Sequence, residues 1–192
     1  TLESMKLRRS VRAYKPEQIA DAELDAVLEA GVYAASGRNM QATKLVVVQD
    51  AETRALLSKI NAEYLGVETD PFYGAPTYVA VFGGKHIRPT YVEDGSLVLG
   101  NLMLGAYAVG LGSCWIHRAK ETFEDERGKE LMRKWGVEEG YVGVGFCALG
   151  YAADPLTVVF QGRTLKIAVD HGITHVLQFF FPLSGAKGPI PV

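Results

Sequence analysis

The chain of 192 residues is long enough to form one domain with a substantial hydrophobic core. Its residues are 48% hydrophobic and 22% charged, a mixture typical of a globular α/β protein and not of a disordered or fibrous one. The formal net charge of −2 argues against a dedicated nucleic-acid-binding protein, because such proteins normally present a strongly basic face.

Apolar residues at helical spacing predict a short helix over residues 1–8 and a second helix from Asp21, its N-cap, to about Ala34. Farther along, β-branched runs alternate with helical patterns. The run at 44–49 is typical of a buried strand. The helix predicted at 95–110 is apolar on almost every side, which places it at the centre of the fold or in an oligomer interface. The remaining predicted elements are strands at 75–82, 112–116 and 141–150 and helices at 51–64 and 125–135.

The predicted strand at 141–150, with the sequence YVGVGFCALG, alternates large residues with small ones. Glycine inside a strand marks a place where another element or a ligand comes close. Beyond about residue 155 the pattern is less regular: TLKIAV (164–169) is compatible with a strand, whereas FFFPLSGAKGPIPV (179–192) is apolar and proline-rich. Because no repeat or linker divides the chain, we predict one α+β domain over residues 1–192, with an atypical tail that wraps around a partner.

The two cysteines, Cys114 and Cys147, both lie inside apolar runs, and we interpret them as buried thiols of a reduced, cytoplasmic protein. Neither a C-x-x-C motif nor a Cys/His spacing indicates a metal site. The N-terminal residues lack the basic-then-apolar pattern of a signal peptide. The longest apolar stretch is interrupted by Gly100, Asn101 and Gly105, so we expect neither secretion nor membrane insertion.

Three arginines crowd the segment LRRSVRAY, residues 7–14, although the whole chain is slightly acidic. Arg8, Ser10 and Arg12 fall at alternate positions, so in an extended segment all three side chains point the same way. Two guanidinium groups and a hydroxyl are well suited to a phosphate, because arginine donates two parallel, charge-assisted hydrogen bonds. The alternative is a solvated basic turn after a short helix.

Two further segments have features of a binding site. In AASGRNMQ, residues 34–41, Asn39 and Gln41 belong to a polar loop that can offer amide groups to the edge of a heterocycle; the alternative is an ordinary helix-to-strand connection. In GLGSCWIH, residues 110–117, glycines let the backbone approach a ligand, and a planar apolar cofactor can lie against Trp115 and Ile116. The alternative is that the tryptophan belongs to the core.

Five segments occur in the order seen in the nitroreductase-like flavoprotein family: RRSVRAY, ASGRNMQATKLVVV, FYGAPTYVAVF, EDGSLVLGNLMLGAYAVGLGSCWIH and GFCALGY. The chain resembles that family from about Leu2 to Ala153. The resemblance implies an α+β fold in which helices surround a central, mainly antiparallel sheet. It also implies a homodimer that binds two FMN molecules at its interface.

The resemblance also implies roles for individual residues. Those that resemble contacts to the FMN phosphate and ribityl chain are Arg8, Arg9, Ser10 and Arg12. Those that resemble a loop reaching FMN from the partner subunit are Ser36, Gly37 and Asn39. Those that resemble the strand end covering one flavin face, with the N–H of Ile116 near flavin N5, are Cys114, Trp115, Ile116 and His117.

The chain departs from the family pattern in two places. His117 stands where many members have glycine, so a titratable ring borders the expected flavin and can modulate it. Family members commonly bring a basic pair from the tail back to the phosphate. Here Arg163 and Lys166 are the candidates, and we assign Arg163 to the cofactor site as an expectation.

The resemblance implies an FMN-dependent NAD(P)H oxidoreductase that passes a hydride from NADH or NADPH through FMN to a small acceptor such as a nitroaromatic or a quinone. One open site used twice predicts ping-pong kinetics. The sequence offers no acid/base dyad, and the chemistry needs none because it belongs to the cofactor. We expect Arg9 or the region of Asn39 to stabilise the negative charge of the reduced flavin. Neither nucleic acid nor membrane is an expected partner.

Two alternatives stay open. The same fold with FMN also performs reductive dehalogenation, enone reduction or flavin-fragmenting chemistry, and a flavin-binding or storage module without turnover belongs to another functional class. Residues 61–72 are expected to cover the acceptor pocket. This segment is short, which favours a permissive reductase over an enzyme with a long substrate-clamping lid.

Overall fold

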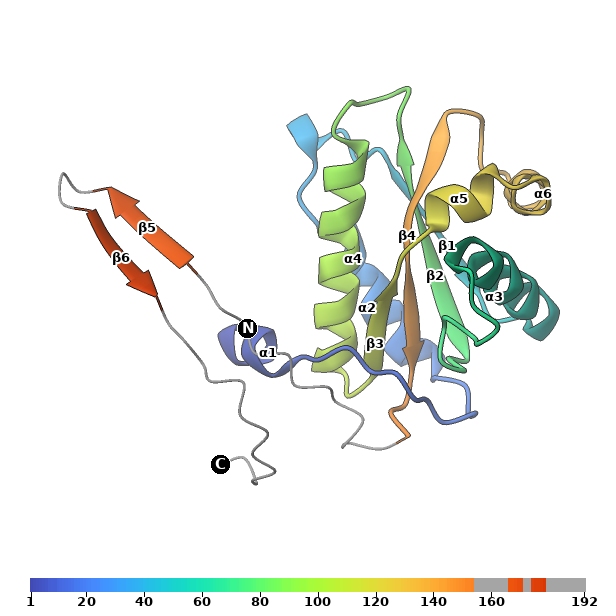
Figure 1. The fold of residues 1–192 in the computed structure, drawn as a ribbon, viewed down its shortest axis with the longest axis horizontal. Coiled ribbons are helices and arrows are strands. Elements are labelled where there is room, and N and C mark those ends of the chain that lie inside the picture. The colour runs from blue at the N-terminus through green and yellow to red at the C-terminus, as the bar shows by residue number, and fades with distance from the viewer. Residues whose placement is uncertain (154–165, 171–173, 179–192) are drawn as a thin grey trace. The chain divides into compact units, whose positions relative to one another are not determined.

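The computed structural model of the protein describes residues 1–153, 166–170 and 174–178 (Figure 1). A four-stranded antiparallel sheet in the order β1-β2-β4-β3 organises the first part. Its strands are β1 (Thr43–Val48), β2 (Thr77–Gly84), β3 (Gly112–Ile116) and β4 (Tyr141–Gly150). Each begins and ends within two residues of its predicted position. The expected α+β fold with a central antiparallel sheet is confirmed.

Burial differs between β2, a middle strand, and β1, an edge strand. Every residue of β2 is buried, whereas β1 lies at an edge and buries only Val48 completely. The expectation that residues 44–49 form a buried strand is therefore wrong for every residue of β1 but Val48, because β1 has a neighbouring strand on one side only. Alternation of side chains across the sheet sends apolar residues to both faces, so each face must be covered.

Helices cover both faces, with α2 and α4 on one side of the sheet and α3, α5 and α6 on the other (Figure 1). The helical elements are α1 (Leu2–Leu7), α2 (Asp21–Val32), the 3₁₀ turn η1 (Gly37–Asn39), α3 (Ala51–Leu65), α4 (Tyr91–Ala108), α5 (Ala119–Glu124) and α6 (Glu126–Lys134). The short helix α5 is not predicted by the sequence pattern. The η1 turn lies within the polar loop predicted at residues 34–41, and the remaining helices match their predicted positions to within four residues.

Local chemistry sets several helix ends. At α3, the Asp50 carboxylate accepts a hydrogen bond from the Thr53 N–H at 2.8 Å, and the helix ends at Gly66 with φ 75°. Asp21 is the first residue of α2 and not its N-cap as predicted. Ala20 is the N-cap, and its N–H donates to the Glu23 carboxylate at 3.0 Å.

The apolar helix α4 buries one face against the sheet and α2, through Val98, Leu99 and Leu102. On its other side Val92 and Leu97 are about half exposed, at 47% and 50%. The helix is therefore central to the fold and also presents apolar surface outward.

Close packing explains the glycines of β4. A Cβ added at Gly143 would lie 2.4 Å from the Ala119 carbonyl oxygen, and one added at Gly145 would lie 2.8 Å from Trp115 Nε1 and from Leu99. Glycines in this strand were expected where either another element or a ligand comes close. At Gly143 and Gly145 the close neighbours are other elements of the chain.

The chain divides into two compact units, residues 1–159 and residues 160–192. In the second, β5 (Lys166–Asp170) pairs antiparallel with β6 (Thr174–Gln178). The strand predicted in TLKIAV is thus present, while β6 is not predicted. Residues 179–192, expected to wrap around a partner, lie outside the described residues. So does Arg163, and the single domain over residues 1–192 stays a prediction.

No helix in the described ranges has both the length and the apolar character needed to cross a membrane. Within the same ranges, no group of three or more His, Cys, Asp or Glu side chains is arranged to hold a metal ion.

Candidate functional site

The arginine-bearing N-terminal segment is extended and lies along β3. Ser10 forms a parallel bridge with Ser113, and the Val11 N–H donates to the Ser113 carbonyl at 3.0 Å. Farther on, the Lys15 N–H donates to the Tyr151 carbonyl at 2.9 Å, past the end of β4. A Cβ at Gly112 would lie 2.8 Å from the buried Val11 side chain, so glycine is required for this close approach. Backbone pairing therefore fixes the position of the segment.

Arg8, Ser10 and Arg12 gather around the start of β3. Burial raises the pKa of the Cys114 thiol, while the charge of Arg12, a hydrogen bond from Ser10 and the charge of Arg8 all act to lower it. All three side chains therefore act on one buried atom. Arg12 makes no ion pair with a carboxylate of the described residues. The result is a positive, hydroxyl-containing site at one end of β3.

Two neighbouring groups refine this picture. The Ser113 hydroxyl is buried and has no hydrogen-bond partner among the described residues, so a donor and acceptor is available beside Ser10. Arg9 turns the other way: its guanidinium donates to the carbonyl oxygens of Lys6 and Arg8, the latter at 2.9 Å, at the C-terminal end of α1. The donors suited to a phosphate are thus Arg8, Ser10 and Arg12, with Arg9 engaged by the helix end.

The second predicted segment forms the η1 turn. Ser36 holds the turn from one side, because its hydroxyl accepts from the Gln41 N–H at 3.0 Å, and the Gly37 N–H donates to the Asp94 carboxylate at 2.9 Å. Asn39 and Gln41 both have positive φ values, 54° and 49°, and both side chains are exposed. The turn therefore presents amide groups outward, as the sequence pattern predicts.

The structure keeps these two segments apart within one chain. The η1 turn bonds to Asp94 in the first turn of α4, whereas Ser10 pairs with Ser113, which follows the last turn of that helix (Figure 1). From Asp94 to Ala108, the rise of an α-helix gives a separation of about 21 Å. A ligand held by the arginines of one chain is therefore not enclosed by the η1 turn of the same chain.

The end of β3 forms the third part of the candidate site. Cys114 and Ile116 are buried on one face of the sheet, and Trp115 packs on the other face, against the cluster of α2 and α4. His117 is exposed, and Arg118 then adopts a left-handed conformation with φ 68° before α5 begins. The tryptophan therefore belongs largely to the core, and the exposed group at this strand end is the histidine.

A buried asparagine holds this strand end. Asn61 on α3 is completely buried, and its Nδ2 donates to the His117 carbonyl at 2.7 Å. Together, Asn61 and Asp94 fix the backbone of two predicted site segments, and neither role is visible in the local sequence pattern. The available signal for Asn61 was its spacing: with Leu57 and Ile60 it falls on the buried face of α3, where a polar side chain needs a partner.

A cleft of about 690 Å³ runs beside α3 and the segment that follows it. Asp70 orders this segment by accepting hydrogen bonds from the Ser58 hydroxyl at 2.5 Å and from the N–H groups of Phe72 and Gly74 at 2.9 and 2.7 Å. Arg54, Lys59 and Glu63 are among the charged residues of its wall. The cleft overlaps residues 61–72, and their role over an acceptor stays a prediction.

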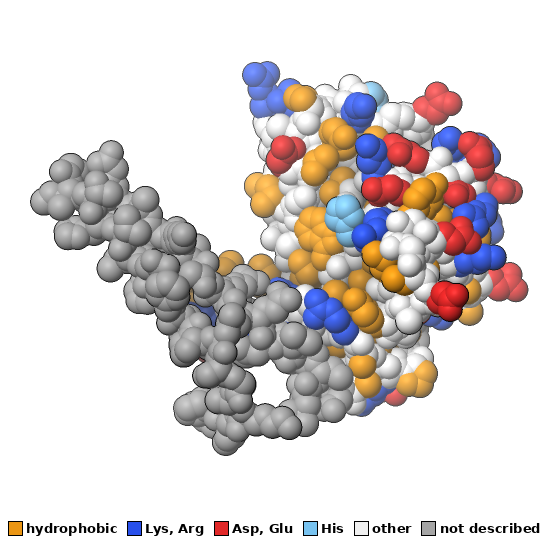
Figure 2. Space-filling model, in the orientation of Figure 1, with side chains coloured by type: hydrophobic (Ala, Val, Ile, Leu, Met, Phe, Trp, Pro, Cys, Tyr) orange, Lys and Arg blue, Asp and Glu red, His pale blue; other side chains and the backbone are white. Residues whose placement is uncertain are grey.

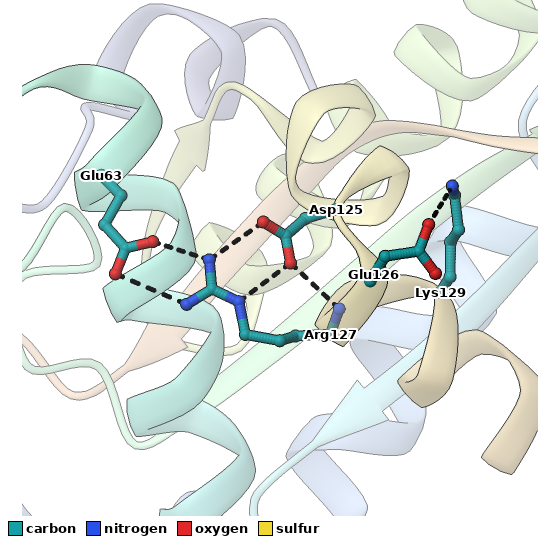
Figure 3. Close-up of polar contacts among 5 residues, drawn as sticks. All are labelled: Glu63, Asp125, Glu126, Arg127 and Lys129. Carbon is teal, nitrogen blue, oxygen red and sulfur yellow. Dashed lines mark hydrogen bonds and ion pairs between the residues drawn. The ribbon is translucent and has the colours of Figure 1, made fainter.

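A cluster of ion pairs around one arginine, Arg127, joins α3 to the start of α6 (Figure 3). Arg127 donates to Glu63 at 2.6 Å and to Asp125 at 2.9 Å, and its own N–H donates to Asp125 at 3.0 Å. These hydrogen bonds lower the pKa of Asp125 to about 2 and also lower that of Glu63. Acidic and basic side chains intermingle over this part of the surface (Figure 2). The charge of Arg127 is matched within the chain.

The fold is that of an α+β protein with helices on both faces of a central antiparallel sheet, and comparison with known proteins identifies the family. The Nitroreductase family model matches residues 5–151. The chain belongs to the nitroreductase family.

Two relatives of known structure and one relative known by its sequence agree with this membership. A nitroreductase with bound FMN from Bacteroides fragilis is 31% identical, with a TM-score of 0.76 over 88% of this chain and 98% of that one. A nitroreductase with bound FMN from Desulfitobacterium hafniense is 26% identical, with a TM-score of 0.72 over 80% of this chain and 89% of the other. An Archaeoglobus fulgidus protein, provisionally named an NADH dehydrogenase/NAD(P)H nitroreductase, is 30% identical over 77% of this chain and 82% of its own length.

Proposed function

We propose that the protein is an FMN-dependent NAD(P)H oxidoreductase of the nitroreductase type, acting on a small acceptor such as a nitroaromatic or a quinone. The observation that carries the proposal is the gathering of Arg8, Ser10 and Arg12 around Cys114, in a chain whose structural relatives contain FMN. The name of the Archaeoglobus relative supports NADH or NADPH as the hydride donor.

The donors at the start of β3 fit the phosphate of FMN. Arg8 and Arg12 supply two positive charges, and Ser10 supplies a hydroxyl on the same segment, next to the buried, unpartnered hydroxyl of Ser113. The N-terminal segment is fixed by backbone hydrogen bonds, so little ordering is needed when a phosphate binds. Arg163 remains a proposed further contact from the tail.

When bound, FMN supplies the hydride chemistry, accepting a hydride from the nicotinamide and delivering it to the acceptor. The residues of this chain bind and orient. Ile116 and His117 form the strand end proposed to border the flavin ring, and Asn61 fixes their backbone through the His117 carbonyl. Asn39 on the η1 turn offers an amide for the negative charge of the reduced flavin. Arg9 is the weaker of the two predicted candidates for this task, because it is engaged at the end of α1.

A homodimer is part of the proposal. Within one chain, the η1 turn and the arginines lie at opposite ends of α4. If both contact one flavin, the two contacts must come from different chains. Large apolar side chains are exposed on α1, which lies against α4, and on and near α2, η1 and α4. They are Leu2, Met5, Leu7, Val32, Tyr33, Met40, Val92 and Leu97. An obligate interface of this kind buries about 2,000–5,000 Å². We expect light scattering to find a dimer, and a monomer that still holds FMN would contradict this part.

Absorbance spectroscopy of the purified protein tests cofactor and activity together. We expect a flavin spectrum at about one FMN per chain, released on denaturation, and anaerobic bleaching by NADH or NADPH. Addition of a nitroaromatic or a quinone should restore the colour. A flavin that neither nucleotide bleaches would identify a binding module without turnover, and a protein that binds no added FMN would overturn the proposal.

A further inference from the structure

The η1 turn is held in an unusual backbone conformation. Arg38, Asn39 and Gln41 have φ values of 53°, 54° and 49°, so three residues with a Cβ lie in the left-handed region within four positions. Such conformations are unfavourable for residues other than glycine, and they persist only where surrounding contacts determine them. Since the side chains of these residues are exposed, the contacts that hold the turn must come from its backbone.

Asp94 supplies the contact that joins the turn to the body of the protein. Its side chain is 3% exposed, and one carboxylate oxygen accepts from the Gly37 N–H at 2.9 Å. The other accepts from the Thr90 hydroxyl at 3.4 Å. A buried carboxylate is costly unless it is hydrogen-bonded, so Asp94 is bound to these two partners. Its place in the first turn of α4 also favours a negative charge.

The fit between the turn and α4 is tight. A Cβ at Gly37 would lie 2.6 Å from the Thr90 hydroxyl oxygen and 3.7 Å from the Asp94 carboxylate, so only glycine allows this approach. The Ser36 hydroxyl closes the other side of the turn on the Gln41 N–H. With both sides held, the side chains of Asn39 and Gln41 stay exposed on the surface.

We propose that Asp94 is a positioning residue for the flavin: through the Gly37 N–H it fixes the η1 turn in the conformation that presents Asn39 to FMN bound by the opposite chain. This inference rests on the proposed function, and it adds a residue that lies outside the three predicted site segments. Asp94 itself does not contact the flavin.

The test compares variants of Asp94 with a matched variant on the same helix. Asn101 also ties α4 to backbone, donating to the Ala30 carbonyl at 2.9 Å, but this bond leads to α2 and not to the turn. FMN dissociation constants are measured by fluorescence titration of the full-length apoprotein, and melting temperatures are measured alongside. We expect Asp94→Ala to weaken FMN binding at least tenfold and Asn101→Ala to change it less than twofold while lowering Tm.

Two further variants separate positioning from general stability. Asp94→Asn keeps an oxygen that can accept from Gly37, so it should recover most of the affinity. Combining Asp94→Ala with Asn39→Ala should weaken binding little beyond the stronger single variant, because both act through one contact. If Asp94→Ala fails to fold, Asp94→Glu takes its place in the cycle. It keeps the charge but moves the carboxylate by one methylene, and we expect it to weaken FMN several-fold.

Unchanged FMN affinity in folded Asp94→Ala, or in Asp94→Glu where the alanine variant fails to fold, would overturn the inference, and so would fully additive effects with Asn39→Ala. The parent protein distinguishes this failure from that of the proposed function. If the parent binds FMN and is bleached by NAD(P)H while Asp94→Ala binds FMN as tightly as the parent, only the positioning role of Asp94 is refuted. A parent that binds no FMN removes both.

Discussion

Arg12 and Arg127 have the same side chain in two opposite settings. Arg127 donates to Glu63 and Asp125, so the chain itself matches its charge (Figure 3). Arg12 acts on the Cys114 thiol and the Tyr14 hydroxyl and has no ion pair with a carboxylate in the described residues. A matched arginine connects elements of the fold, whereas a cation placed beside neutral groups is available to an anionic ligand. The comparison separates a structural cluster from a binding site by chemistry alone.

The largest expected effect distinguishes the two arginines directly. A charge-assisted hydrogen bond to a phosphate contributes about 1.5–3 kcal/mol. Arg12→Ala should therefore weaken FMN binding by about tenfold or more, and Arg8→Ala should act in the same direction. Arg127→Ala is the control, with an expected lower Tm and an unchanged FMN dissociation constant. Near-native flavin retention in both Arg8→Ala and Arg12→Ala would show that the phosphate binds elsewhere.

A charge-conserving substitution sharpens the comparison. Lysine keeps the positive charge but lacks the planar fork that donates two parallel bonds. We expect Arg12→Lys to bind FMN only a few-fold more weakly than the parent, between the parent and Arg12→Ala. Arg127→Lys should leave FMN binding unchanged. The measurement is the same fluorescence titration, and equal losses for Arg12→Lys and Arg12→Ala would mean that the fork, and not the charge, holds the phosphate.

Much of the fold followed from sequence patterns because those patterns are local. Alternation in residues 141–150 and helical spacing in residues 51–64 report burial directly, and both elements form where predicted. Helix α5 escaped prediction because its six residues are too short to show a period. The edge position of β1 depends on which strands pair, and strand order is a property of the whole sheet.

The candidate site was predictable where its functional groups lie together in one short segment, and not where it depends on hydrogen bonds from distant residues. The alternation of Arg8, Ser10 and Arg12 is visible in the sequence, and so is the polar loop at Asn39. Asp94 accepts a hydrogen bond from Gly37, which is 57 positions away in the sequence. Asn61 donates one to the carbonyl of His117, which is 56 positions away. No local pattern encodes such pairs. For the same reason, the engagement of Arg127 by Glu63 could not be read from its own segment.

Acid should disrupt the Arg127 cluster and leave the charges of Arg8 and Arg12 unchanged. Hydrogen bonds from Arg127 lower the pKa of Asp125 to about 2 in the folded protein, below the value of about 3.9 in an unfolded chain, and they lower that of Glu63 too. The folded state therefore binds fewer protons than the unfolded state. Its extra stability is present above about pH 5 and is lost as the pH falls toward 2.

Thermal melts of the apoprotein across this range test the pH dependence. We expect the difference in Tm between the parent and Arg127→Met to be largest near neutral pH and to shrink as the solution is acidified. A difference that stays constant down to pH 2.5 would contradict the assigned pKa directions. Because the Glu63 side chain is about half exposed, at 47%, and that of Asp125 is partly exposed, at 17%, solvent screens both ion pairs and the whole effect should be modest.

The smallest expected effect concerns His117. Its substitution tests whether a third cation, in addition to Arg8 and Arg12, acts on the flavin. The His117 side chain is exposed at the end of β3, where Asn61 fixes the backbone and many relatives are expected to have glycine. Histidine changes its charge near neutral pH, and a protonated ring close to the flavin favours the negative charge of the reduced cofactor. We therefore expect His117→Gly to lower the flavin reduction potential, because the substitution removes a ring that can carry a positive charge beside the flavin. FMN affinity should change little, since the proposed phosphate contacts come from the segment that pairs with Ser113, near the start of β3. Spectroelectrochemical titration of the two proteins provides the measurement. If the potential is unchanged, His117 does not sense the flavin, and the arginines and the η1 turn carry the electrostatics of the site.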